Sequence, residues 1–447
     1  MSSQLSRKLI SAAKALKNIV WDVRSKEDVS AFKTSVETKI GDSPALSKNV
    51  YKVTVDGDPH EKTIQLKLRF GDEWFSYSVS SKPPRNCTNL EVPLVDLANL
   101  EGSAAQRKVI ADALQQAAET SGFFYIKNHG IPPDVIQEAQ NQAKRFFSQP
   151  VDMKMLALQD ASKGHRAGWR APNTSHVCPS EKSVFRWRYS PEHDPLYDHD
   201  QLDPQTISQH SEDEPHVWAA TAHLKNFKVD SLAYWRSCLI LARKLLPLFA
   251  ISLSLPETYF DSMATFPEAD GLYNFYPATK AGALSGFAPD TEGLGSHTDF
   301  QCFTILWQDQ NGGLQAVTAE NEWIWVTPVE GTLVVNIGDF FRRLTNDRYK
   351  SAIHRAYNQG LGDADRISMP FFFGFNSDAE CAVFPSCIDD LHPEKYKPIT
   401  YGQVISTYVL YTKEYDVLLT AAHAYSGGSY GLAVAQQLQS RHFAWYM

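Results

Sequence analysis

The sequence has few cysteines, and they follow no recognisable pattern. Six cysteines are spread over 447 residues without a Cys-x-x-Cys pair and without the spacing of a disulfide framework. Zinc ribbons and small disulfide-stapled domains depend on such spacings, so the sequence disfavours both. Cysteines without partners are typical of a reducing compartment, and we expect a cytoplasmic protein.

Excess positive charge and long apolar stretches are also missing. The chain has 43 Lys and Arg against 51 Asp and Glu, a net charge of −8 and a pI near 6.0. This balance offers no basic field that would attract the phosphates of nucleic acid or an anionic membrane. No apolar stretch reaches the roughly 18 residues that are needed to span a bilayer. We therefore expect neither a nucleic-acid partner nor a membrane partner.

The first 86 residues are expected to form a small α+β extension of unknown role. Residues 1–42 have the spacing of two helices, and the first of these, basic and free of acids, also resembles a targeting peptide; we favour the plain helix. Residues 64–79 alternate between apolar and polar side chains around a Gly-Asp step, which is typical of short antiparallel strands. Residues 82–86 (KPPRN) are typical of a linker. The extension is a candidate for dimerisation, and the sequence leaves the oligomeric state open.

Residues 87–447 carry the pattern of a second, larger domain. Helices are expected at about 104–118, 133–148 and 217–253, whereas 160–216 has the composition of long loops. Short apolar or alternating segments, separated by Gly, Pro and Asn, then follow one another from about 271 to 376. That cadence predicts a mainly β fold with flanking helices, a double-stranded β-helix or jelly roll, with further helices after residue 400.

Three His-x-acid steps are candidates for half of a metal site. Two histidines and one carboxylate bind Fe(II) while leaving open positions for O2, and two of the ligands commonly come from one such step. On a strand, residues i and i+2 project to the same face. Of the three steps, His210/Glu212 lies in an acidic loop and His392/Glu394 beside a proline, whereas His297/Asp299 leads into the strand-like segment 303–306.

The third ligand is expected on a later strand. His354 lies in the strand-like stretch AIHRA, while the other late histidines lie in a turn or on predicted C-terminal helices. A lone histidine on a strand is more often an ordinary core residue, but a well-placed His-x-Asp upstream favours a ligand role. The sequence thus predicts a metal site of His297, Asp299 and His354.

An arginine in an aromatic strand indicates an anion site. Arg366 and Ser368 share one face of the segment RISMPFFF, and a buried guanidinium needs an anionic partner. A bidentate Arg–carboxylate pair with a hydroxyl beside it would anchor a small dicarboxylate. A pair with a carboxylate of the protein itself is the alternative.

The order of these motifs resembles the isopenicillin-N-synthase-like branch of the Fe(II)/2-oxoglutarate-dependent dioxygenases. The resemblance covers residues 92 to about 410 and rests on eight segments: VPLVDL (92–97), GFFYIKNHG (122–130), NFYP (274–277), GSHTDFQCFTIL (295–306), DQNGGLQ (309–315), GTLVVNIGD (331–339), TNDRYKSAIHRA (345–356) and RISMPFFF (366–373). It implies a jelly roll in which His297, Asp299 and His354 bind Fe(II). It also implies that Arg366 and Ser368 bind the distal carboxylate of 2-oxoglutarate.

The resemblance implies an oxygenase that consumes 2-oxoglutarate and O2, releases succinate and CO2, and hydroxylates, desaturates or cyclises a small molecule of secondary or amino-acid-derived metabolism. Asn274 and Tyr276 fall where members of the family contact the cosubstrate, and the segment 128–130 (NHG) has a structural role. Two other functions stay open: an Fe(II) oxidase that does not use 2-oxoglutarate, and a non-catalytic binding protein, which the intact triad disfavours. Candidate substrate contacts are Arg186, Arg188, Phe300 and Phe373, and a solvated face is the alternative for the two arginines.

Overall fold

The computed structural model describes residues 63–70, 73–80, 84–160, 165–171, 182–198, 200, 202–211, 214–278, 292–357 and 364–404. The helices predicted within residues 1–42 lie outside this part of the chain. So does the C-terminal helical region beyond residue 404, although residues 401–404 are helical, where that region was predicted to begin.

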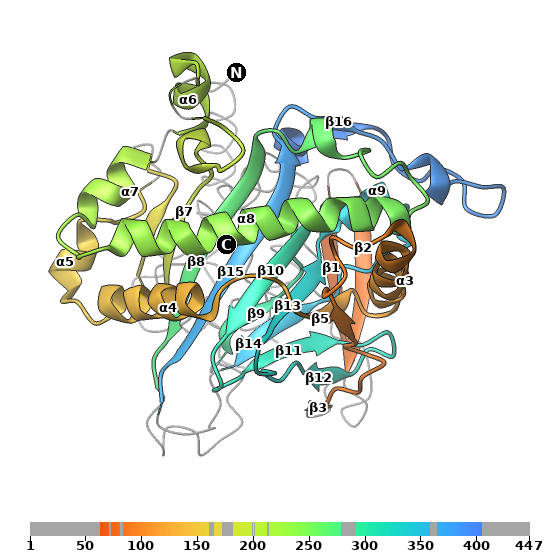
Figure 1. The fold of residues 1–447 in the computed structure, drawn as a ribbon. Helices are drawn as coiled ribbons and strands as arrows, with labels where there is room; N and C mark the ends of the chain where they lie inside the picture. Colours follow the sequence, from red (N-terminus) through yellow and green to blue (C-terminus); the bar gives the residue numbers. More distant parts are fainter. Residues whose placement is uncertain are drawn as a thin grey trace, which may run out of the picture.

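An eight-stranded sheet forms the larger layer of the fold (Figure 1). In spatial order its strands are β4 (Leu94–Asp96), β5 (Phe123–Lys127), β13 (Thr332–Ile337), β10 (Phe303–Gln308), β15 (Arg366–Asn376), β8 (Pro267–Tyr276), β7 (Ser183–Trp187) and β6 (Gly168–Arg170). Strands β13, β10, β15, β8 and β7 pair antiparallel with their neighbours, and β15 is the longest. Strands distant in sequence therefore lie side by side, as a jelly roll requires.

A five-stranded sheet forms the second layer. Its spatial order is β3 (Arg85–Asn86), β12 (Trp323–Trp325), β11 (Leu314–Val317), β14 (His354–Tyr357) and β9 (Glu292–His297). Apolar side chains from both sheets meet in one buried cluster that includes Leu306 and Val334 from the larger sheet and Leu314 and Ala316 from the smaller. The two sheets thus face each other across a shared interior, and the predicted jelly roll is confirmed.

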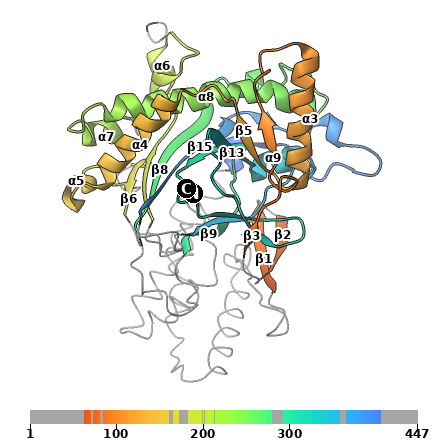
Figure 2. The same ribbon diagram turned by 60° about the horizontal axis from the view of Figure 1, so that its bottom comes forward.

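Helices cover the outer face of the larger sheet (Figures 1 and 2). The helix α8 (Phe227–Ser252) runs across β8, β15 and β10, with α3 (Ala104–Thr120) and α4 (Pro133–Phe147) on the same side. Alternation along each strand decides which side chains meet these helices. On β15, Phe371 and Phe373 belong to the main core under α8, whereas Phe372 belongs to a separate cluster on the inner face.

The remaining elements are short. The helices are α5 (Val151–Met155), α6 (Pro204–His210), α7 (Glu214–Ala220) and α9 (Asp339–Leu344), with 3-10 turns η2 (Pro191–His193), η4 (Asp261–Met263) and η5 (Pro385–Cys387). Two further antiparallel strand pairs are β1 (Thr63–Phe70) with β2 (Glu73–Ser80) and β16 (Glu380–Cys381) with β17 (Ile399–Thr400). Among the residues that the structure describes, no helix combines the length and the apolarity that crossing a membrane would take.

Three expectations from the sequence need correction. The helix predicted over 217–253 is two helices, α7 and α8, and Asn226 before α8 has a left-handed backbone with φ of 62°. The loops predicted over 160–216 contain β6 and α6, while β7 agrees with the strand that the segment FRWRY (185–189) indicates. The linker predicted at 82–86 ends in β3, whose Arg85 and Asn86 pair in parallel with β12, so these residues belong to the smaller sheet.

Candidate metal centre and cosubstrate site

The two histidines of the candidate metal site come from neighbouring strands of the smaller sheet. His297 is the last residue of β9, and it stands directly opposite His354, the first residue of β14. Opposite residues of an antiparallel pair project to the same face. Their rings are 4.2 Å apart between centroids, and both side chains are buried. The edge of Phe123 packs against the His354 ring at 5.4 Å.

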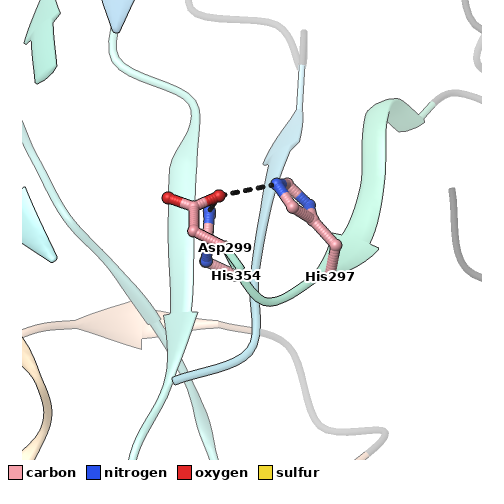
Figure 3. A group of neighbouring side chains, drawn as sticks. All are labelled: His297, Asp299 and His354. Atoms are coloured by element: carbon pink, nitrogen blue, oxygen red, sulfur yellow. Dashed lines mark ion pairs between the residues drawn. The ribbon is translucent and has the colours of Figure 1, made fainter. Parts of the chain in front are cut away.

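The carboxylate of Asp299 faces both imidazoles (Figure 3). Its Oδ1 is 3.6 Å from Nε2 of His297 and 3.5 Å from Nε2 of His354. Its Oδ2 faces the larger sheet, where it accepts hydrogen bonds from the Thr304 hydroxyl on β10 and, at 2.7 Å, from the Asn336 amide on β13. One carboxylate oxygen is therefore held by the protein, and the other is directed at both histidines.

Asp299 is not on the strand that carries His297. It lies in residues 298–302, the segment that crosses from the smaller sheet to the larger one. Its place is set by the start of α9: Asp339 N–H donates to the Asp299 carbonyl at 2.7 Å, and Asp339 Oδ2 accepts from the Thr298 hydroxyl at 2.8 Å. The i, i+2 argument assumed a shared strand face, whereas a hydrogen-bonded crossover brings Asp299 to the histidines.

Gly338 is required where α9 meets this crossover. Its own N–H donates to the Cys302 carbonyl at 2.9 Å. A Cβ at this position would lie 2.1 Å from the Gln301 carbonyl oxygen and 3.1 Å from that of Asp299. Contacts this short are not tolerated, so a larger residue would push away the segment that holds Asp299.

Protonation equilibria couple the three residues. Burial alone would raise the pKa of Asp299, but the adjacent His354 and His297 hold it well below its usual range. For His354, burial acts to lower the pKa, while the Asp299 carboxylate raises it above the ordinary value of histidine. Nδ1 of His354 lies 3.1 Å from the Ala352 carbonyl oxygen, which can only accept a hydrogen bond. The proton of the neutral ring is therefore on Nδ1, and Nε2 keeps a lone pair that can bind a metal.

These donors suit a divalent transition metal. The ligand atoms of His297, Asp299 and His354 all lie within 4.8 Å of one another, and no other such group of three occurs among the described residues. The competing step at His392 is exposed, and its ring contacts Asp389 instead. Glu212, the acid of the other step, lies outside the described residues. Two imidazoles and one carboxylate are the donor set of non-haem Fe(II) sites with open positions.

Arg366 and Ser368 lie on the same inner face, opposite Tyr276 and Asn274 of β8 respectively. All four side chains are buried. Within the described part of the chain, no carboxylate forms an ion pair with Arg366, which answers the alternative of a protein acid as its partner. The Arg366 guanidinium stands 4.7 Å from the centre of the Tyr276 ring.

The hydrogen bonds in this group are long. Both Arg366 Nη1 and Asn274 Nδ2 donate to the Ser368 hydroxyl at 3.4 Å, where about 2.9 Å is usual for a good bond. Asn274 Oδ1 is buried and accepts no hydrogen bond from the residues that the structure describes. Burial raises the pKa of the Tyr276 phenol, although Arg366 opposes that shift, so the hydroxyl stays protonated. The group thus keeps donors available for an anion.

Gln308 is a member of this group that the sequence did not reveal. It lies opposite Ser368 on β10, its amide donates to the Val326 carbonyl at 3.0 Å, and its Oε1 accepts from Arg366 Nη2 at 3.4 Å. The Arg366 Nε also donates to the Gly312 carbonyl. These contacts fix the direction of the guanidinium. Period-two alternation from Thr304 would have placed Gln308 on the inner face.

The four candidate substrate contacts lie in different surroundings. Arg186 forms an ion pair with Asp270, and Arg188 forms one with Glu268 at 2.8 Å, so both arginines have protein carboxylates beside them. Phe300 is partly exposed next to Asp299. Phe373 must be corrected: it is fully buried in the core under α8, stacked on Phe303, because odd-numbered residues of β15 face the helices.

A jelly roll with two histidines and a carboxylate inside, beside a buried arginine that forms no ion pair with any described carboxylate, defines a class of protein: the non-haem iron oxygenases that take a dicarboxylate cosubstrate. Comparison with known families agrees. Residues 271–375 match the 2OG-Fe(II) oxygenase superfamily, and residues 92–218 match the N-terminal region of the non-haem dioxygenases, described for morphine synthesis.

Similar proteins extend this match over most of the chain. The 2-oxoglutarate-Fe(II) type oxidoreductase ppzC of Metarhizium majus is 42% identical over 77% of this chain and 93% of its own length. The relative hxnY of Emericella nidulans, of the same type, is 31% identical over 70% of this chain and 88% of its own length. The crystal structure of a full-length Neurospora crassa protein in complex with 2-oxoglutarate and 5-formyluracil superposes with a TM-score of 0.61 at 26% identity, over 74% of this chain and 99% of that one.

The chain belongs to the 2-oxoglutarate-Fe(II) oxygenase superfamily. It is a non-haem oxidoreductase that uses Fe(II), 2-oxoglutarate and O2.

Proposed function

We propose that His297, Asp299 and His354 bind the Fe(II), and that the enzyme uses it to hydroxylate, desaturate or cyclise a small molecule. The observation that carries this assignment is that the two carboxylate oxygens of Asp299 have different contacts. Its Oδ2 is taken by Thr304 and Asn336, and its Oδ1 is directed at Nε2 of both histidines. Fe(II) bound there supplies open coordination positions for O2 and cosubstrate.

We propose that Arg366, Ser368, Asn274 and Tyr276 bind the distal carboxylate of 2-oxoglutarate. Support comes from the buried guanidinium, which forms no ion pair with a carboxylate in the part of the chain that the structure describes, and from the long bonds to the Ser368 hydroxyl. A carboxylate can take two parallel N–H bonds from arginine and one O–H bond from a neighbouring hydroxyl. Gln308 would keep the guanidinium in place for that contact.

The test is succinate formation in the purified full-length chain, loaded with Fe(II) without oxygen and then exposed to O2 with and without 2-oxoglutarate. We expect slow succinate formation even without a further substrate, and none in His354→Ala. The matched control is His392→Ala, which removes an exposed histidine of the other His-x-acid step and should behave as wild type. If 2-oxoglutarate is not consumed and no succinate forms although Fe(II) is bound, the result favours the oxidase alternative. If the protein binds no Fe(II), the result favours the non-catalytic binding protein.

The substrate is proposed to be a small molecule of secondary or amino-acid-derived metabolism, in line with the fungal relatives. Cytoplasmic location, a separate extension over residues 1–86 and its part in dimerisation stay predictions. Fluorescent tagging and a comparison of the oligomeric state with and without residues 1–62 would test them.

A further inference from the structure

One cross-strand row of the larger sheet leads from the metal ligands to a buried carboxylate. Asn336, Thr304, Phe372 and Asp270 stand opposite one another on β13, β10, β15 and β8. Opposite residues share a face, and the first two bond to Asp299, so the whole row faces the metal ligands. Asp270 on β8 lies two strand spacings from Thr304 on β10, which is roughly 10 Å.

Asp270 is the charged member of this row. It is only 6% exposed. Its Oδ2 forms an ion pair with Arg186 Nη2, and its Oδ1 lies 3.7 Å from Arg188 Nε, too far for a hydrogen bond. Among the described residues, no group donates a hydrogen bond to that Oδ1. A buried carboxylate oxygen without a donor costs about 1–3 kcal/mol or more, so a substrate N–H that donates to it would bind favourably.

The surroundings of Asp270 are apolar on one side and cationic on the other. Phe372, Leu272 and Val184 form a buried cluster of their own on the inner face, separate from the core under α8. Arg186 stands opposite Leu272 and is directed to Asp270. The anchor proposed for 2-oxoglutarate is elsewhere: Asn274 is four residues from Asp270 along β8, or about 13 Å.

We propose that Asp270 and its two arginines bind an amide or lactam edge of the oxidised substrate, which rests on the proposed function. A substrate N–H donates to Asp270 Oδ1, and the adjacent carbonyl oxygen accepts from a guanidinium of Arg186 or Arg188. The flat part of the substrate packs on Phe372 and Leu272, within reach of the metal ligands. A purely hydrocarbon substrate would leave the carboxylate oxygen unpaired, and sites of this kind reject such molecules strongly.

The experiment measures succinate formation by the full-length protein with Fe(II), 2-oxoglutarate and O2, alone and with thymine, 2-pyridone or the cyclic dipeptide of glycine and proline. We expect at least one of these lactams to raise succinate formation several-fold above the rate without it. The same compound with every ring N–H methylated should lower the efficiency of that stimulation by about 100-fold or more, because it cannot donate to Asp270.

Variants separate recognition from stability. Asp270→Ala should abolish the stimulation, and Asp270→Asn, which keeps a carbonyl acceptor, should retain part of it. The control is Asp194→Asn, which weakens another buried Asp–Arg pair, with Arg243, away from the inner face. It should lower the melting temperature but keep the ratio of stimulated to unstimulated rate at the wild-type value.

The proposal is overturned if no lactam stimulates a protein that forms succinate on its own, or if the N-methylated compounds stimulate equally. It is also overturned if Asp270→Ala keeps the wild-type ratio. In these cases the oxygenase assignment stands and the Asp270 carboxylate is a structural partner of the arginines. If the protein forms no succinate at all, the proposed function fails and this inference fails with it.

Discussion

Replacing Asn336 by alanine should weaken Fe(II) binding without removing a ligand. The Asn336 amide donates to Asp299 Oδ2 at 2.7 Å, in a site where the aspartate is only 2% exposed to solvent. A hydrogen bond to a charged group contributes about 1.5–3 kcal/mol. Loss of a residue that orients a metal ligand commonly reduces metal affinity by about 10- to 100-fold, which corresponds to about 1.4–2.7 kcal/mol. The two estimates agree.

The measurement is a calorimetric titration of the metal-free protein with Fe(II) in the absence of oxygen. Asn346→Ala is the matched control, because Asn346 is a buried amide that donates to backbone carbonyls of residues 387, 392 and 393, away from the site. It should lower the melting temperature and leave the Fe(II) affinity unchanged. Thr304→Val removes the other donor to the same oxygen, and the double variant should show a non-additive loss. An Fe(II) affinity of Asn336→Ala within about twofold of wild type would refute the reasoning.

Two further predictions follow from the same geometry. Gly338→Ala should lower both the melting temperature and the Fe(II) affinity, because its Cβ would lie 2.1 Å from the Gln301 carbonyl oxygen; wild-type Fe(II) affinity in a folded Gly338→Ala protein would contradict the role given to the crossover. Arg366→Lys keeps the positive charge but loses the two-pronged contact, so the KM for 2-oxoglutarate should rise by about 10- to 100-fold while Fe(II) affinity is retained; initial rates of succinate formation give the KM, and an unchanged value would show that the guanidinium does not bind the cosubstrate.

Much of the fold follows from local pattern. The short segments predicted between about 271 and 376 correspond to β8, β10, β11, β12, β13, β14 and β15, and the helices predicted at about 104–118 and 133–148 are α3 and α4. The strand β9, with the sequence EGLGSH, escaped because two glycines and no β-branched residue carry no strand signal. It is a strand because it pairs with β14. The break before α8 also escaped: α7 ends at Ala220, residues 221–226 form turns, and the left-handed Asn226 directly precedes α8.

The candidate site was predictable where its residues are chemically unusual. Two histidines, an acid and an arginine in an aromatic strand stand out in any sequence. The residues that orient Asp299 do not stand out in the sequence. Asn336 on β13, and Gly338 and Asp339 at the start of α9, reach Asp299 or its segment only through tertiary contacts. Phe373 was a different kind of error: Arg366 and Ser368 already fix the inward parity of β15, so Phe372 could have been chosen from the sequence.

The crossover at residues 298–302 affects how metal binding changes the stability of the protein. Both histidines belong to one sheet, and the groups that hold the aspartate belong to the other, so a bound metal ion ties the two layers together as a clamp. A ligand that binds only the folded chain stabilises it, by about 2.7 kcal/mol when its concentration is 100 times its Kd. Differences of that size change how much of a protein survives in a cell. Iron supply is thus expected to set the amount of this enzyme as well as its rate.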